Sequence, residues 1–119
     1  MRVVSVRGAI TVEKNTKEDI VKSTEELLNE LLIKNNIHNE SVISIIFSST
    51  KDLNKEYPAF AARKLGFVKC GLMCFQEMEV ENSLKKCIRV LILFNSNKKQ
   101  SEIRHVYLKD AIKLRPDLL

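Results

Sequence analysis

The run "CIRVLILF", Cys87 to Phe94, constrains the fold of this chain more than any other stretch. Its branched and aromatic residues are typical of a strand that is buried on both faces. Because side chains alternate between the two faces of a strand, Ile88 and every second residue after it share one face, whereas Cys87, Arg89 and Leu91 share the other. Arg89 therefore places a permanent positive charge on a face that looks buried, and such a charge needs an anionic partner.

Two kinds of partner would satisfy Arg89. A protein carboxylate, from Glu77 or Glu79, would form a buried ion pair with it. An anionic ligand would instead make Arg89 part of a binding pocket, because a guanidinium presents paired donors in a plane that matches a carboxylate. The residues by themselves leave both interpretations open.

Several segments have the composition of strands and are separated by polar stretches or by stretches with glycine or proline. These predicted strands span residues 3–13, 41–50, 72–75, 84–94 and 103–108. We expect an interruption of the first strand at Arg7 and Gly8, because a glycine inside a strand often marks a bulge or a close backbone approach. The segment "QEMEVENS" that follows the third strand is expected to be a turn.

Two helices are expected between these strands. Thr16 is a suitable N-cap for a long helix, with Asp19 in the capping-box position, and apolar residues then recur at helical spacing as far as Leu31. This helix should end near residues 35–36. A short helix is predicted to start at Pro58 and to end before a glycine.

These elements predict a single α+β domain over residues 1–119, with a mixed five-stranded sheet covered by one long and one short helix. Apolar residues fall on both faces of the predicted strands, and two helices offer little area to cover both faces. We therefore expect copies of the chain to pack through their sheets in an oligomer.

Composition argues against several classes of protein. With 45% hydrophobic and 29% charged residues, the chain is expected to be soluble and globular. It has no run of about 18 apolar residues and no basic-then-apolar leader, so neither a membrane span nor a secretory signal is expected, and a cytoplasmic location is the default. The three cysteines form no CxxC pair and the two histidines lie far from them, so we expect reduced thiols and no metal site.

The net charge of +5 suits a small anionic substrate. It does not favour a nucleic-acid binder, because the basic residues do not cluster and no aromatic residues are interleaved with them. Motifs of nucleophilic or phosphate-binding sites, such as GxSxG and GxGxxG, are missing from the sequence. The unusual feature is the setting of four arginines: Arg7, Arg63, Arg89 and Arg115.

Five motifs, taken in order from about residue 3 to 118, resemble one family: "VRGAITVE", "PAFAAR", "CFQEMEV", "LKKCIRV" and "IRHVYLKDAIKLRPDL". They are similar to the monofunctional chorismate mutases, the class with a trimeric pseudo-α/β-barrel fold. The resemblance implies an isomerase that rearranges chorismate to prephenate, towards phenylalanine and tyrosine, by an intramolecular [3,3] sigmatropic shift. Such a shift needs no nucleophile, metal or redox cofactor, so no cofactor is expected.

The resemblance also implies roles for individual residues. Arg89 would donate to the ether oxygen of chorismate, where negative charge grows as the C–O bond breaks. Arg7 would bind a substrate carboxylate, with Tyr107 hydrogen-bonding beside it. Glu77 would accept a hydrogen bond from the ring hydroxyl and balance the positive site.

Further pocket residues follow from the same resemblance. Met73 and Cys74 would contact the ring end of the substrate, and Tyr57 would line the pocket. Arg63 and Arg115 would belong to a loop and a tail that close over the ligand. In this family each pocket lies between neighbouring subunits of the trimer.

Some positions depart from the family pattern. Tyr57 replaces a usual phenylalanine, Phe60 stands in place of a lysine and Met73 in place of a threonine, and the segment 64–69 looks one residue short. These departures concern loop closure and affinity more than the reaction. A second hypothesis, from another class, is a non-catalytic trimeric module that binds small carboxylates through Arg7 and Arg89.

Overall fold

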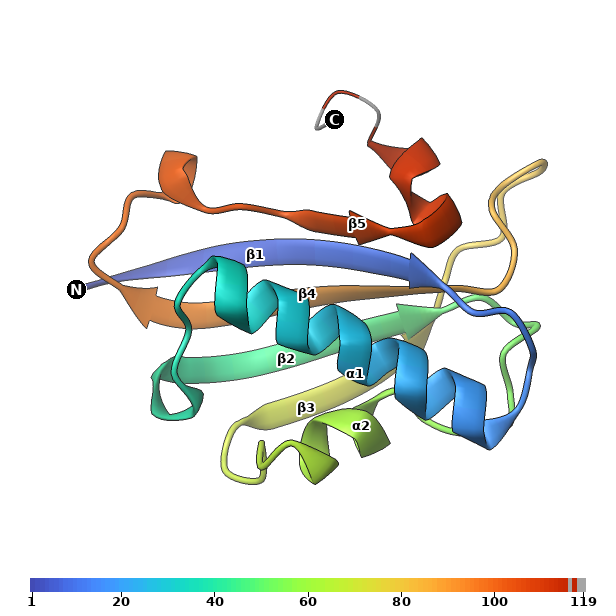
Figure 1. Ribbon diagram of the computed structural model, residues 1–119, viewed down its shortest axis with the longest axis horizontal. Coiled ribbons are helices and arrows are strands. Elements are labelled where there is room, and N and C mark those ends of the chain that lie inside the picture. Colours follow the sequence, from blue (N-terminus) through green and yellow to red (C-terminus); the bar gives the residue numbers. More distant parts are fainter. Residues whose placement is uncertain (116, 118–119) are drawn as a thin grey trace.

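The computed structural model describes residues 1–115 and 117 of the chain. Within that part, five strands form one sheet in the order β3-β2-β4-β1-β5 (Figure 1). The strands are β1 (Arg2–Thr11), β2 (Val42–Ser49), β3 (Gly71–Gln76), β4 (Cys87–Ser96) and β5 (Val106–Leu108). β4 runs antiparallel to its neighbours β1 and β2, whereas β3 and β5 pair in parallel with β2 and β1. The predicted mixed sheet is confirmed.

Both α-helices lie on the same side of the sheet (Figure 1). The long helix α1 (Lys17–Lys34) begins after the predicted N-cap Thr16, whose hydroxyl accepts a hydrogen bond from the backbone three residues later. The short helix α2 (Ala59–Lys64) follows Pro58, and soon after it Gly66 has φ +97°, a conformation that glycine adopts easily. Both helix predictions are confirmed. No helix among the described residues is long and apolar enough to cross a membrane.

The side of the sheet that carries the helices forms the main hydrophobic core. In β4, the residues of the predicted apolar face are all buried: Ile88, Val90, Ile92 and Phe94. They pack in one cluster with buried leucines of α1, namely Leu27, Leu28 and Leu31. The alternation read from the sequence of β4 therefore identifies its core face correctly.

The opposite side is much less covered, and we call it the open face. It is defined by Arg7, Ala9, Ile46, Ser48, Met73, Phe75, Arg89, Leu91 and Tyr107. Met73 is 57% exposed and Phe75 51% exposed, and Leu91 is only half-buried. The prediction that both faces of β4 are buried is wrong for a single chain, because α1 and α2 fall on the same side. The short 3-10 helix η3 (Lys109–Leu114) packs at the β1–β5 edge of the open face.

Two strand predictions need correction. β1 continues through Arg7 and Gly8 without interruption. Gly8 serves a close approach instead, since a Cβ atom there would lie 2.9 Å from the carbonyl oxygen of Val106. β5 begins at Val106, three residues later than predicted, because the side chain of Asn35 binds the backbone N–H (2.7 Å) and C=O (2.9 Å) of Arg104.

Candidate functional site

Arg89 lies in a row of side chains that crosses the open face. Residues directly opposite each other in neighbouring strands point to the same side of a sheet. The register pairs Phe75 with Ser48, Ser48 with Arg89, Arg89 with Ala9, and Ala9 with Tyr107. One residue from each of the five strands therefore contributes to the row, and Arg89 lies at its centre.

The anionic partner of Arg89 is Glu77. The Nε atom of Arg89 lies 3.2 Å from Oε2 of Glu77, and their side chains are 49% and 24% exposed. The hydroxyl of Ser48 donates a hydrogen bond to the same Oε2 atom, at 2.7 Å. Glu79, the other candidate partner, forms an ion pair with Lys51 instead. Arg89 thus meets a protein carboxylate, but at a solvent-accessible position where a ligand can also reach it.

A cavity of about 350 Å³ adjoins this ion pair. Arg89, Glu77, Leu84 and Cys87 are among the residues that line it. The pKa of Cys87 is raised to about 11, mainly because the thiol is buried. The thiol is therefore neutral near pH 7, and the cavity contains no thiolate nucleophile at that position.

Arg7 lies beside the Arg89 row on the open face. It is opposite Leu91 in β4, and its side chain is exposed. Its backbone N–H donates a hydrogen bond to Nδ1 of His105 at 3.0 Å. Burial first, and then the positive charges of Arg7 and Arg115, lower the pKa of His105. At pH 7 the imidazole is therefore mostly neutral, and its Nδ1 atom can accept the hydrogen bond from the backbone N–H of Arg7.

Arg115 approaches the same end of the open face from the C-terminal segment. Its Nε and Nη2 atoms donate to the two carboxylate oxygens of Asp117, at 3.0 and 2.8 Å. The pKa of Arg115 is raised and the pKa of Asp117 is lowered, in both cases mainly because of these hydrogen bonds. Tyr107 also contributes to raising the pKa of Arg115, so these two predicted site residues lie near each other. Residues 116 and 118 of the motif "RPDL" lie outside the described part of the chain.

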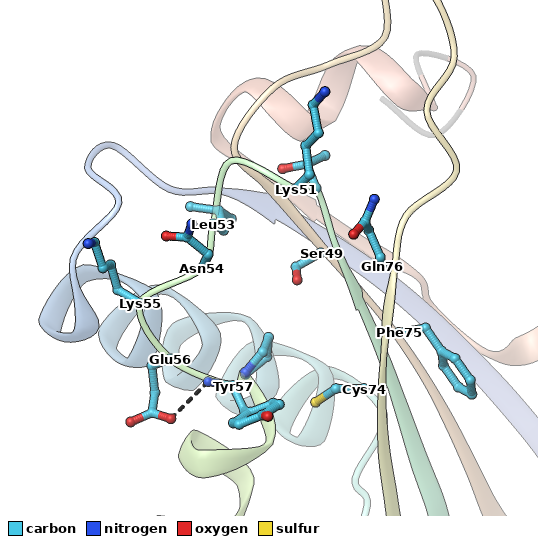
Figure 2. Close-up of a pocket in the computed structure, with 12 residues that line it drawn as sticks. Ser49, Lys51, Leu53, Asn54, Lys55, Glu56, Tyr57, Cys74, Phe75 and Gln76 are labelled. Carbon is cyan, nitrogen blue, oxygen red and sulfur yellow. Dashed lines mark hydrogen bonds between the residues drawn. The ribbon is translucent and has the colours of Figure 1, made fainter.

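Three other predicted site residues gather elsewhere, at the edge formed by β3 and α2. Tyr57 and Cys74 line a cavity of about 420 Å³ (Figure 2). Cys74 is opposite the buried Phe47, so it points to the helix-bearing side, towards Tyr57, whereas Phe75 points away from them (Figure 2). Burial raises the pKa of Cys74, and the positive charge of nearby Arg63 partly opposes this shift.

The predicted site residues thus form two groups in one chain. The open-face group contains Arg7, Glu77, Arg89, Tyr107 and Arg115. The β3-edge group contains Tyr57, Arg63 and Cys74. Met73 belongs to neither group: it lies on the open face of the edge strand β3, opposite Ile46. Within one chain the sheet separates Cys74 from Glu77, as strand alternation predicts.

Sequence reasoning missed Ser48 and His105. Alternation alone places Ser48 on the same face as Ile46, but not next to an arginine. That proximity depends on β4 lying between β1 and β2, which no local pattern reveals. The two histidines were considered only in arguing against a metal site, so His105 was given no role in the candidate site. The described residues contain no group of three His, Cys, Asp or Glu side chains that could hold a metal ion.

The chain is similar to chorismate mutases in both sequence and structure. The family model described as "Chorismate mutase type I" matches residues 3–118. The chain is 42% identical over 119 residues to the chorismate mutase AroH of Bacillus subtilis (strain 168), covering 99% of this chain and 94% of that protein. It is 45% identical over 117 residues to the chorismate mutase AroH of Thermus thermophilus, covering 98% and 96%. A solved chorismate mutase structure from Clostridium thermocellum matches with a TM-score of 0.88 and 47% identity, covering 90% of this chain and 96% of that one.

Proposed function

Because this chain belongs to the chorismate mutase type I family, and is thus an isomerase that converts chorismate to prephenate in aromatic amino acid biosynthesis, we propose that its open-face group holds the substrate and stabilises the transition state. The family resemblance noted in the motifs is confirmed by these matches over nearly the whole chain. The reaction is an intramolecular rearrangement. The protein therefore contributes by fixing a compact conformer of chorismate and by placing charge where it develops.

The observation that carries this proposal is the position of Arg89 on the central strand of the sheet, held 3.2 Å from Glu77 on an open face. A guanidinium has five N–H donors, so the contact through Nε leaves donors for a ligand. We assign one of them to the ether oxygen of chorismate. That oxygen gains negative charge as the C–O bond breaks, so the contact strengthens in the transition state and acts mainly on kcat.

The remaining open-face residues suit the polar groups of chorismate. Arg7 is proposed to bind one carboxylate, with the Tyr107 hydroxyl beside it. Arg115, which the structure pairs with the carboxylate of Asp117, is proposed to exchange that partner for a substrate carboxylate when the site closes. Both contacts to Glu77 use Oε2, so Oε1 is proposed to accept the hydrogen bond of the ring hydroxyl.

We further propose that three chains associate and that each pocket lies between two of them. The exposed apolar side chains Met73 and Phe75 on the open face support burial against another copy. The separation of the two groups of site residues supports it independently. Tyr57, Arg63 and Cys74 of one subunit would complete the pocket that the open-face group of its neighbour begins.

A cytoplasmic location is also proposed. The three cysteines of the chain, Cys70, Cys74 and Cys87, are all free thiols. Unpaired cysteines suit a reducing compartment.

The test of the proposed site is the rate at which purified variants convert chorismate to prephenate. Arg89→Ala should lower kcat by about 100-fold or more, because it removes a preorganised donor to the developing charge. The control is Arg104→Ala, which also removes one exposed arginine side chain while the backbone of Arg104 stays bound to Asn35. If Arg89→Ala changes KM alone, or if both variants lose activity equally, the assignment of Arg89 is overturned. A protein that binds chorismate without accelerating its rearrangement would instead support a carboxylate-binding module.

A further inference from the structure

We propose that Ser48 is a positioning residue for the reaction, which acts by orienting the carboxylate of Glu77 and, through it, the guanidinium of Arg89. This inference rests on the proposed roles of Glu77 and Arg89 and adds a third residue to their arrangement. Ser48 lies in the middle of the sheet, on β2, and faces the open side.

The geometry joins the three side chains at one atom. The Ser48 hydroxyl donates to Oε2 of Glu77 at 2.7 Å, and Nε of Arg89 lies 3.2 Å from the same oxygen. Ser48 and Arg89 are also directly opposite each other in the β2–β4 register. The two donors therefore converge on Oε2 from adjacent strands, and both of these strands are internal to the sheet.

Glu77 requires such support because of its place in the chain. It is the first residue after β3, and the segment that follows carries the exposed side chains of Met78 and Val80. Its backbone N–H donates to the carbonyl oxygen of Ser49 at 2.8 Å, which fixes the main chain but not the side-chain torsions. A glutamate side chain has several accessible rotamers, so a second anchor is needed to hold its carboxylate.

The Ser48 hydroxyl supplies that anchor. A hydrogen bond to an ionised carboxylate is stronger than one between neutral groups. The backbone of Ser48 is held on both sides, because β2 pairs with β3 and with β4 at this position. Without it, the Glu77 side chain can turn towards solvent, and Arg89 loses the fixed partner that directs its remaining donors. Small displacements of such groups reduce the rate because catalysis depends on their preorganisation.

The decisive comparison is between Ser48→Thr and Ser48→Val. Threonine and valine have the same shape, and only threonine keeps the hydroxyl, so any effect of the added methyl group is common to both variants. We expect kcat of Ser48→Val to be about 10-fold below that of Ser48→Thr, with KM values that agree within about 2-fold and equal melting temperatures. Ser48→Ala removes the hydroxyl without adding bulk, so its kcat should fall below that of the wild type by about the same factor. Ser44→Ala, on the same strand opposite Leu93, is the control and should keep wild-type kinetics.

A double-mutant cycle tests whether Ser48 acts through Glu77. In a Glu77→Ala background, Ser48→Val and Ser48→Thr should have the same kcat, because there is no carboxylate left to orient. Equal activity of the two Ser48 variants in the wild-type background, or a difference confined to KM, overturns the proposal. If Glu77→Ala and Arg89→Ala themselves keep full activity, the proposed roles of those two residues fail instead, and the two outcomes are distinct.

Discussion

Asn35, the residue that caps the C-terminus of α1, binds both backbone polar groups of Arg104, which lies 69 positions later in the chain. Its Oδ1 accepts from the Arg104 N–H at 2.7 Å, and its Nδ2 donates to the Arg104 carbonyl oxygen at 2.9 Å. The amide also donates to the carbonyl oxygen of Leu31 at 3.0 Å. One buried side chain therefore joins the end of the long helix to the segment that leads into β5, where His105 and Tyr107 face Arg7 and Ala9.

Asn35→Ala should lower the free energy of unfolding by about 1–3 kcal/mol, because it removes these hydrogen bonds and leaves both backbone polar groups of Arg104 without their partner on α1. Urea denaturation of the purified protein measures the change. The matched control is Asn29→Ala, an exposed position on α1, which should shift stability by less than about 0.5 kcal/mol. Equal effects at both positions would contradict a specific role for Asn35.

Gly8→Ala should destabilise the protein by about 1–3 kcal/mol, through crowding rather than through strain in φ. A Cβ atom at Gly8 would lie 2.9 Å from the backbone oxygen of Val106 and 3.0 Å from the Cδ1 atoms of Leu27 and Leu31. The control is Gly71→Ala, where the nearest atom would be 3.8 Å away and the change should be small. Thermal unfolding of the two variants distinguishes these expectations. A Gly8 variant as stable as the Gly71 variant would show that β1 and β5 can separate at little cost.

His105 should make stability fall as the pH decreases. Burial, followed by the charges of Arg7 and Arg115, lowers its pKa below the ordinary value of 6.5 in the folded protein. The contribution of neutral His105 to the free energy of unfolding is therefore fully present above about pH 6.5. It is lost as the pH falls from there through the folded-state pKa, because the imidazole takes up a proton more readily in the unfolded chain than in the folded protein. His105→Asn, which retains an oxygen acceptor but does not titrate, should lose less stability between about pH 7.5 and 5.5 than the wild type does. His38→Asn is the control; a wild-type-like pH dependence in His105→Asn would contradict the prediction.

Mixing of inactive subunits should reveal whether each pocket uses two chains. Arg63→Ala is expected to raise KM, and Arg89→Ala to lower kcat, so each variant alone should be nearly inactive at low chorismate concentration. If the proposed trimer is reassembled from equal amounts of both variants, about a quarter of the sites would combine an intact Arg63 with an intact Arg89, and activity should return in about that fraction of the sites. A mixture of Arg89→Ala with Glu77→Ala should not recover, because one subunit supplies both residues. Activity equal to the mean of the separate variants would show that each chain forms its own site.

Much of the local structure could be predicted from the sequence. The alternation in β4 separated the buried face of Ile88 from the face of Arg89, and the N-cap Thr16 located the start of α1. Pro58 located the start of α2 in the same way. These features depend on residues that are near each other in the chain, whose spacing decides which side chains share a face and which backbone groups are capped.

The ends of strands could be predicted less well. β5 is shorter than its apolar residues indicate because the side chain of Asn35 competes for the backbone of Arg104. β1 is more regular than expected because Gly8 accommodates a neighbouring backbone instead of forming a bulge. In both cases a contact with a distant part of the chain outweighs the local preference.

The sequence by itself determined the strand and helix types, the face on which Arg89 lies and its need for an anionic partner. Only the tertiary structure decided that this partner is Glu77, that Ser48 shares it, and that Tyr57 and Cys74 lie on the other side of the sheet. The physical reason is that face and propensity are set by adjacent residues, whereas strand order and register are set by hydrogen bonds and packing between distant ones. Ser48 and Arg89 are neighbours because β4 lies between β2 and β1 in the sheet and pairs with β2 in this register.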